Sequence, residues 1–172
     1  VFEEVAKFLQ AHDGEADVIA IPIYFFGTRD GGHKLNAKFR QGTRVIDLEA
    51  EWRNVQLSLA SAFVRAEAAR KYCFQEDLVM AHAEDARELN KLLIHNPKLG
   101  VVAGAAYRYR KWGSSTLDGS ERKKKSYNDY VADFPLWIMA YSQREVHRIP
   151  KFLQYTVLFD LQWKIKQPKI PD

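Results

Sequence analysis

An acidic pair, Glu84-Asp85, precedes a run of residues with helical periodicity near the middle of the chain. A carboxylate at the start of a helix is held in its ionised form by the helix dipole and the free backbone amides, which does not make it more basic. Such a group can take a proton from an attacking hydroxyl as a general base. Simple helix capping is the alternative, and the residue types alone leave both open.

Basic, aromatic and hydroxyl-bearing residues follow one strand later. The segment 107–112 reads Tyr-Arg-Tyr-Arg-Lys-Trp, and 113–116 reads Gly-Ser-Ser-Thr. Guanidinium groups match phosphate oxygens, and a loop rich in hydroxyls can close over a diphosphate. A solvated basic edge strand is the competing interpretation. The residues we expect to contact a phosphorylated substrate are Arg108, Arg110, Ser114 and Ser115.

Charge is concentrated in one part of the chain. The 172 residues carry a net charge of +4, and seven Lys or Arg lie between positions 108 and 125. Their local field would attract phosphate groups. The 47% hydrophobic content indicates a folded domain with a core rather than a disordered chain.

Cysteine content and hydropathy bear on location. Cys73 is the single cysteine, so no intrachain disulfide can form and a reducing compartment is the simpler expectation. The sequence has no apolar run of the roughly 20 residues that span a bilayer. We therefore expect a cytoplasmic protein, with peripheral attachment at the inner face of the membrane left open.

Strand and helix patterns alternate along the chain, which predicts the α/β class. Helical spacing predicts helices over 1–9, 65–72 and 84–96, and a helical tail from 127 onward. Apolar or alternating runs predict strands over 17–26, 55–64 and 100–109, with an extended segment or hairpin over 38–48. Pro22 weakens the first strand, and Pro135 splits or kinks the tail.

Several of these segments carry a resemblance to a known family. The chain resembles the second half of a family-2 glycosyltransferase with a GT-A fold. The residues that carry this resemblance are Phe74, Glu84-Asp85, Gly100-Val101-Val102, 107–110 and Ser114-Ser115. Three further segments resemble teichoic-acid-type glycosyltransferases and their polyol-phosphate relatives: 33–39, 56–58 and 159–163. These matches are short but run over nearly the whole chain.

The resemblance implies a partial GT-A, Rossmann-like mixed sheet with flanking helices. Residues 1–121 would form the acceptor-side part, and 122–172 a helical extension packed on it. Asp85 would be the general base and Glu84 its partner, while His33 would contact substrate if it is not an ordinary loop residue. The reaction implied is inverting transfer of a sugar from a nucleotide-diphosphate donor to an acceptor hydroxyl, such as that of a cell-wall polyol-phosphate polymer.

A metal-binding motif is missing from the sequence. A metal-dependent GT-A enzyme needs an Asp-x-Asp-like pair for Mg or Mn, and Asp13-Gly14-Glu15 is only a turn-like imitation. His82 and Asp85 would share a helical face, but two ligands are too few for a metal site. We therefore expect the divalent cation in the complete enzyme, none bound by this part, and no transfer by this part alone.

A noncatalytic module is the rival interpretation. Arg interleaved with aromatic residues over 107–112 would also suit a surface that holds an anionic polymer or a glycan. Nucleic acid is not expected as a partner of the enzyme. Because a sheet deprived of its first strands would expose an edge, the sequence is also compatible with a homodimer.

Overall fold

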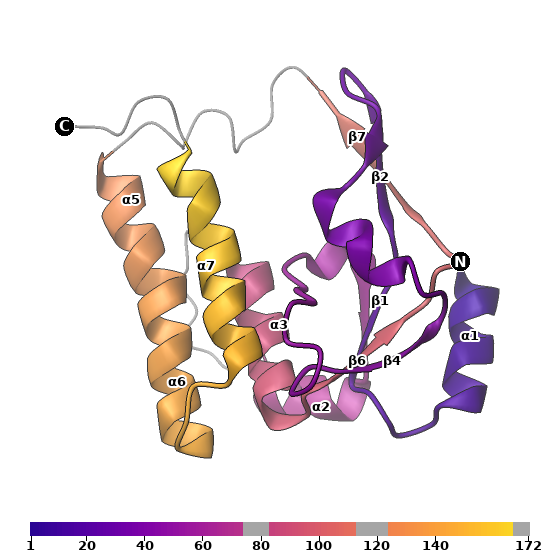
Figure 1. The fold of residues 1–172 in the computed structure, drawn as a ribbon, viewed down its shortest axis with the longest axis horizontal. Helices are drawn as coiled ribbons and strands as arrows, with labels where there is room; N and C mark the ends of the chain where they lie inside the picture. Colours follow the sequence, from indigo (N-terminus) through magenta and orange to yellow (C-terminus); the bar gives the residue numbers. More distant parts are fainter. Residues whose placement is uncertain (74–82, 113–123, 167–172) are drawn as a thin grey trace.

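The computed structural model describes residues 1–73, 83–112 and 124–166. Two small sheets follow one another, with α1 on one side and a layer of helices on the other (Figure 1). The predicted α/β class with a mixed sheet, flanking helices and a helical C-terminal segment is confirmed.

The first sheet has four strands in the order β4-β6-β1-β5. Their bounds are Val18–Ala20 for β1, Arg44–Asp47 for β4, Ala62–Val64 for β5 and Lys98–Val101 for β6. Strands β1 and β6 are parallel, and β4 and β5 pair with them in antiparallel fashion at the two edges. The three residues of β1 are all buried, as expected of an apolar strand with helices on both faces.

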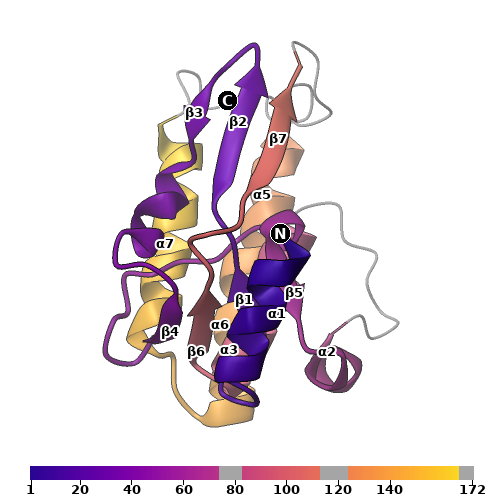
Figure 2. The same cartoon turned by 90° about the vertical axis from the view of Figure 1, so that its right-hand side faces the viewer.

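The second sheet continues the central pair of the first, as Figure 2 shows. It consists of β3 (Gly31–Gly32), β2 (Ile23–Gly27) and β7 (Tyr107–Lys111), with β2 and β7 parallel. The predicted strand 17–26 is thus interrupted at Pro22, which has no amide hydrogen to donate. The predicted strand 100–109 is interrupted opposite it, and the Tyr107 amide donates to the Pro22 carbonyl at 2.8 Å.

The predicted strand 55–64 is wrong over most of its length. Only β5 forms a strand, Leu59–Ser61 is a 3-10 turn, and 55–58 has no regular structure. The alternation fails because Val55 and Gln56 are both buried, at 3% and 2% exposed. Side chains, rather than a neighbouring strand, form hydrogen bonds with the backbone groups of this segment.

The region 38–48 also differs from the predicted extended segment or hairpin. Lys34–Phe39 forms a 3-10 helix, and the extended part is limited to β4. The two are joined by a turn in which Gly42 has a φ of +81°, a conformation that favours glycine.

The predicted helices are confirmed where the structure describes them. They are α1 Phe2–Ala11, α2 Ala66–Tyr72, α3 Glu84–His95, α5 Lys124–Val131, α6 Trp137–Val146 and α7 Lys151–Ile165. Asn96-Pro97 ends α3 as expected. Pro135 lies inside a π-helical turn, Ala132–Leu136, that joins α5 to α6. The wider turn accommodates a ring that would clash in an α-helix.

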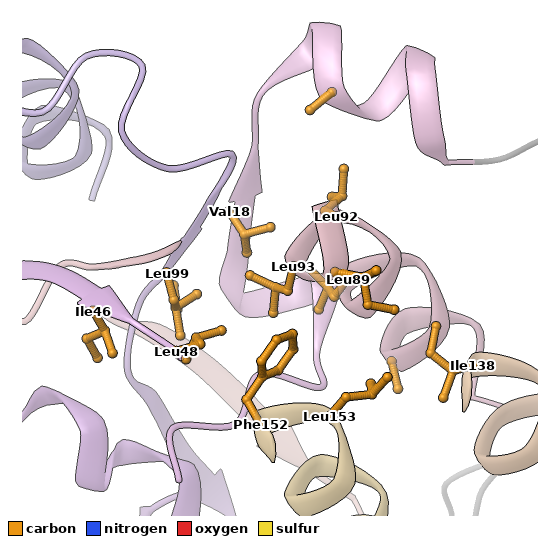
Figure 3. Close-up of a cluster of buried hydrophobic side chains, with 14 of the residues drawn as sticks. Val18, Ile46, Leu48, Leu89, Leu92, Leu93, Leu99, Ile138, Phe152 and Leu153 are labelled. Atoms are coloured by element: carbon orange, nitrogen blue, oxygen red, sulfur yellow. The ribbon is translucent and has the colours of Figure 1, made fainter. Parts of the chain in front are cut away.

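One large core lies between the first sheet and the helices α3, α6 and α7 (Figure 3). Its buried members come from every one of these elements, including Val18, Ile46, Leu89, Leu99, Ile138 and Phe152. A smaller core lies on the other side of the sheet, under α1, with Phe8 at its centre. The C-terminal helices therefore share the main core with the sheet; the predicted boundary at 121 stays a prediction.

Gly100 fits under α1 because it has no side chain. A Cβ at this position would lie 2.7 Å from Cε1 of Phe8 and 3.0 Å from Cγ1 of Ile19. We expect Gly100→Ala to lower the free energy of unfolding by about 1–3 kcal/mol through overpacking. Urea denaturation measures the change, and adding Phe8→Leu should recover part of it. A loss that Phe8→Leu leaves in full would contradict this explanation.

Candidate functional site

The N-terminus of α3 lies at the carboxyl ends of the parallel strands β1 and β6. This follows from the connection, because α3 leads through a short turn into β6 and so runs antiparallel to it. In α/β sheets, ligands bind outside the carboxyl ends of the strands. The same ends lead directly into β2 and β7, so the acidic pair and the second sheet extend from one edge of the first sheet (Figure 2).

Asp85 does not cap its own helix. Its Oδ2 accepts a hydrogen bond from the backbone amide of Leu59 at 3.0 Å, across 26 residues of sequence. The cap position is Ala83, in the left-handed conformation and without a side-chain hydrogen bond. The carboxylate thus joins α3 to the 3-10 turn, and among the described residues its Oδ1 accepts no hydrogen bond.

The surroundings of Asp85 make it a better base. Burial raises the pKa of its carboxyl group, the Leu59 amide lowers it, and repulsion from Glu84 raises it, with a net upward direction. This corrects the expectation that its placement would leave Asp85 no more basic. Glu84 itself is exposed to solvent. The half-buried Asp85 can therefore accept a proton more readily than an ordinary surface carboxylate.

Arg108 and Arg110 lie on one exposed face of β7. The guanidinium of Arg108 lies 5.6 Å from the centre of the Phe26 ring, and that of Arg110 lies 3.5 Å from the Trp112 ring. Neither forms an ion pair with another described residue. With respect to the described residues, both guanidinium groups therefore retain their donors for an anionic ligand.

His33 lies on the other face of the second sheet. Its Nδ1 accepts a hydrogen bond from the Leu35 amide at 3.1 Å, capping the 3-10 helix, and its ring lies 5.5 Å from that of Phe25. Phe25 precedes Phe26, the ring beside Arg108, and successive residues of a strand face opposite sides. The structure thus does not bring His33 together with the two arginines. Burial, and then nearby cations beginning with Lys38, lower its pKa.

Two further cations lie with His33 on this face: Lys111, which belongs to the predicted basic segment, and Arg29, which was not predicted. The Lys111 ammonium lies 5.4 Å from the Phe25 ring and 4.9 Å from the Tyr109 ring. Arg29 lies 5.1 Å from the same Phe25 ring. Phe25 and Tyr109 are directly opposite each other in β2 and β7, with ring centres 5.8 Å apart. We call this set, Phe25, Arg29, His33, Tyr109 and Lys111, the aromatic-basic face.

A buried polar cluster was also missed. The Lys38 ammonium donates to the Val55 carbonyl and, at 2.5 Å, to Oε1 of Gln56. The Asn90 side chain donates to the Ala86 carbonyl at 2.7 Å and to the Gln56 carbonyl at 3.4 Å. Nothing in the spacing of the lysines distinguishes Lys38 from its solvent-exposed neighbours, although the 56–58 segment was part of the family resemblance.

Other predicted residues lie outside the part of the chain that the structure describes. They are the substrate-binding candidates Ser114 and Ser115, together with Phe74 and His82.

The described residues do not fit a divalent cation. Among 1–73, 83–112 and 124–166, no three His, Cys, Asp or Glu side chains gather as metal ligands. In the Asp13-Gly14-Glu15 turn, the Asp13 carboxylate pairs with Arg65 at 3.1 Å and that of Glu15 pairs with His12 at 3.0 Å. The divalent cation of the complete enzyme, Mg or Mn, stays a prediction.

No helix within the described ranges is long and apolar enough to cross a membrane.

Two curated proteins of Bacillus subtilis are similar in sequence. The minor teichoic acid biosynthesis protein GgaB is 34% identical over 166 residues, covering 95% of this chain and 18% of GgaB. The minor teichoic acid biosynthesis protein GgaA is 26% identical over 148 residues, covering 85% of this chain and 33% of GgaA. The chain thus spans a third or less of the length of these relatives. No family model matches it.

A solved structure shares the fold. TarS of S. aureus, crystallised in complex with UDP-GlcNAc, superposes with a TM-score of 0.61 over 96% of this chain and 48% of the TarS chain. The sequence identity is 15%, so this likeness shows the fold alone. Together with the sequence matches, it confirms the resemblance that 33–39, 84–85 and 107–110 indicated.

Proposed function

We propose that this chain, which belongs among the teichoic-acid-type glycosyltransferases with a GT-A fold, is the acceptor-side part of an inverting family-2 enzyme. The complete enzyme moves a sugar from a nucleotide-diphosphate donor to a hydroxyl group of a cell-wall polyol-phosphate polymer. The observation that carries this proposal is the half-buried Asp85, placed at the carboxyl ends of β1 and β6 with a raised pKa.

In the proposed step, the acceptor oxygen attacks the anomeric carbon of the donor while Asp85 takes the hydroxyl proton. The new bond from oxygen to carbon forms as the bond to the diphosphate breaks, and the nucleoside diphosphate leaves with the bonding electrons. Attack on the face opposite the leaving group inverts the configuration at the anomeric carbon. A positioned general base contributes typically 10²–10⁴-fold to such a rate.

Arg108 and Arg110 are proposed to hold the donor diphosphate. A hydrogen bond to a charged group is worth about 1.5–3 kcal/mol, so losing one such bond from each arginine weakens binding by roughly 10²–10⁴-fold. We expect the Arg108→Ala, Arg110→Ala double variant of the complete enzyme to raise the KM for the donor by that factor. Steady-state kinetics measure it, with Arg53→Ala, an arginine stacked on Trp52, as the matched control. An unchanged donor KM in the double variant would mean that the two arginines do not bind the donor diphosphate.

The function itself is tested by transfer assays on the complete enzyme. TarS binds UDP-GlcNAc, so UDP-linked sugars are the first donors to offer, with poly(glycerol phosphate) or poly(ribitol phosphate) as acceptor and with Mg, Mn or chelator. We expect a labelled sugar on the polymer with inverted anomeric configuration. Retention of configuration, or no transfer to either polymer with any donor, would contradict the proposal.

A binding module remains the second candidate, because the aromatic-basic face gathers cations around two half-buried rings. Such a surface can hold an anionic polymer without chemistry. Salt-dependent binding of the polymer together with the absence of transfer in the assay above would favour this candidate.

Two associations of the complete enzyme are also part of the proposal: peripheral contact with the inner face of the membrane, and a homodimer. Sedimentation with anionic vesicles tests the first, and light scattering after size-exclusion chromatography tests the second.

A further inference from the structure

The segment 55–61 lies between two anchors. On one side the Lys38 ammonium binds the Val55 carbonyl and the Gln56 side chain. On the other side the Leu59 amide donates to Asp85. Since 55–58 has no regular structure, its conformation depends on such side-chain contacts rather than on a ladder of backbone hydrogen bonds.

Lys38 is an unusual anchor because it is buried, at 6% exposed, beside neutral groups. Among the described residues it forms no ion pair, and both of its hydrogen-bond acceptors are uncharged. Burial lowers the pKa of its ammonium group to about 7. A lysine held against this desolvation cost indicates that the contacts it makes are needed.

Gln56 passes the constraint along the segment. Its Nε2 donates to the Ser58 carbonyl at 2.8 Å and to Oγ of Ser61 at 3.2 Å, on both sides of Leu59. Asn90 of α3 donates to the Gln56 carbonyl. The ammonium of Lys38 is therefore connected, through the Gln56 side chain, to the turn that meets Asp85. The backbone carbonyl of the same residue joins the segment to α3, the helix that carries Asp85.

We propose that Lys38 is a positioning residue for the base: through Gln56 it fixes segment 55–61 so that the Leu59 amide holds one oxygen of Asp85 and leaves the other to face the acceptor. This inference rests on the proposed role of Asp85. Lys38, a buried residue of the 33–39 segment, would thus act in the reaction without touching the donor or the acceptor.

The direction of the expected effect follows from the groups around Asp85. The Leu59 hydrogen bond lowers the pKa of Asp85, while burial and Glu84 raise it. Segment 55–61 contains no titratable side chain, so Glu84 is the charged neighbour whose effect on Asp85 is resolved. If the Leu59 hydrogen bond is lost while Asp85 stays half-buried, the lowering contribution disappears and the pKa of Asp85 rises further. The base is then protonated over a wider range of acidic pH.

The test is Lys38→Met in the complete enzyme. We expect the acid limb of the kcat/KM profile to move to higher pH and kcat to fall roughly tenfold or more, because small misplacements of a catalytic group are costly, while the donor KM stays unchanged. Hydrogen exchange of the 55–61 amides should become faster. Lys34→Met is the matched control, since Lys34 is in the same 3-10 helix but is exposed beside Trp163.

A second variant covers the case in which Lys38→Met does not fold. Gln56→Met keeps the volume and removes the amide, and it should give the same shift of the acid limb. An acid limb that stays in place in a folded variant would overturn the inference, whatever happens to kcat. Asp85→Asn in the same assay separates the two levels: if it is inactive while Lys38→Met keeps the wild-type limb, only this inference fails.

Discussion

Replacing Asp85 by Asn should reduce kcat of the complete enzyme by roughly 10²–10⁴-fold while donor binding remains nearly intact. The Asn side chain keeps an oxygen that can accept from the Leu59 amide, so the joint between α3 and the 3-10 turn is preserved. What is lost is the ability to take a proton. Initial rates of transfer and a direct titration of donor binding measure the two quantities separately.

Glu84→Gln is the matched control for that experiment. Glu84 is exposed, and its charge raises the pKa of Asp85. Removing this charge should therefore lower the pKa of Asp85 and move the acid limb of the pH profile to lower pH. Full transfer by Asp85→Asn would remove Asp85 from the mechanism, and the enzymatic proposal would then lose the observation that carries it.

Replacing Phe152 by Ala should lower the free energy of unfolding by about 3–5 kcal/mol. Phe152 is 1% exposed and points from α7 into the main core toward Leu48 and Leu93 (Figure 3). The truncation leaves a cavity where the sheet, α3 and α7 meet, and none of these elements can move in to fill it without disturbing the others. For a chain of this size, the midpoint of thermal unfolding should fall by roughly 6–20 °C.

Leu158→Ala serves as the comparison, since Leu158 belongs to the same helix and is 67% exposed. It should cost well under 1 kcal/mol. Calorimetry also tests whether the C-terminal helices melt with the sheet. A separate, low-temperature transition for Phe152→Ala, with the sheet unaffected, would mean that 122–172 is an independently stable unit.

The sequence predicts those helices and strands that have a clear local periodicity of apolar residues. The apolar spacing of α3 and its Asn96-Pro97 end are both found in the structure, and Pro22 interrupts a strand as expected. The strand predicted over 55–64 is wrong because the alternation of apolar and polar residues there is a coincidence. Gln56 is buried by a lysine that precedes it by 18 residues, and no local rule contains that partner.

The candidate site shows the same division. A carboxylate at the start of a helix is visible in the sequence, but the Leu59 amide that it binds is 26 residues away and depends on how the chain packs. The alternation of β7 correctly places Arg108 and Arg110 on one face. That His33 lies on the opposite face depends on the pairing of β3 and β2, which residue types alone do not determine.

The π-helical turn at Ala132–Leu136 sets the rotation of α6 about its own axis. Each residue of an α-helix turns it by roughly 100°, so deleting a single residue here would rotate α6 about its own axis by more than a quarter turn. Met139 and Ser142 would then take the places of Ile138 and Tyr141 in the core. The number of residues between 132 and 136, more than the identity of their side chains, therefore determines which face of α6 packs into the core.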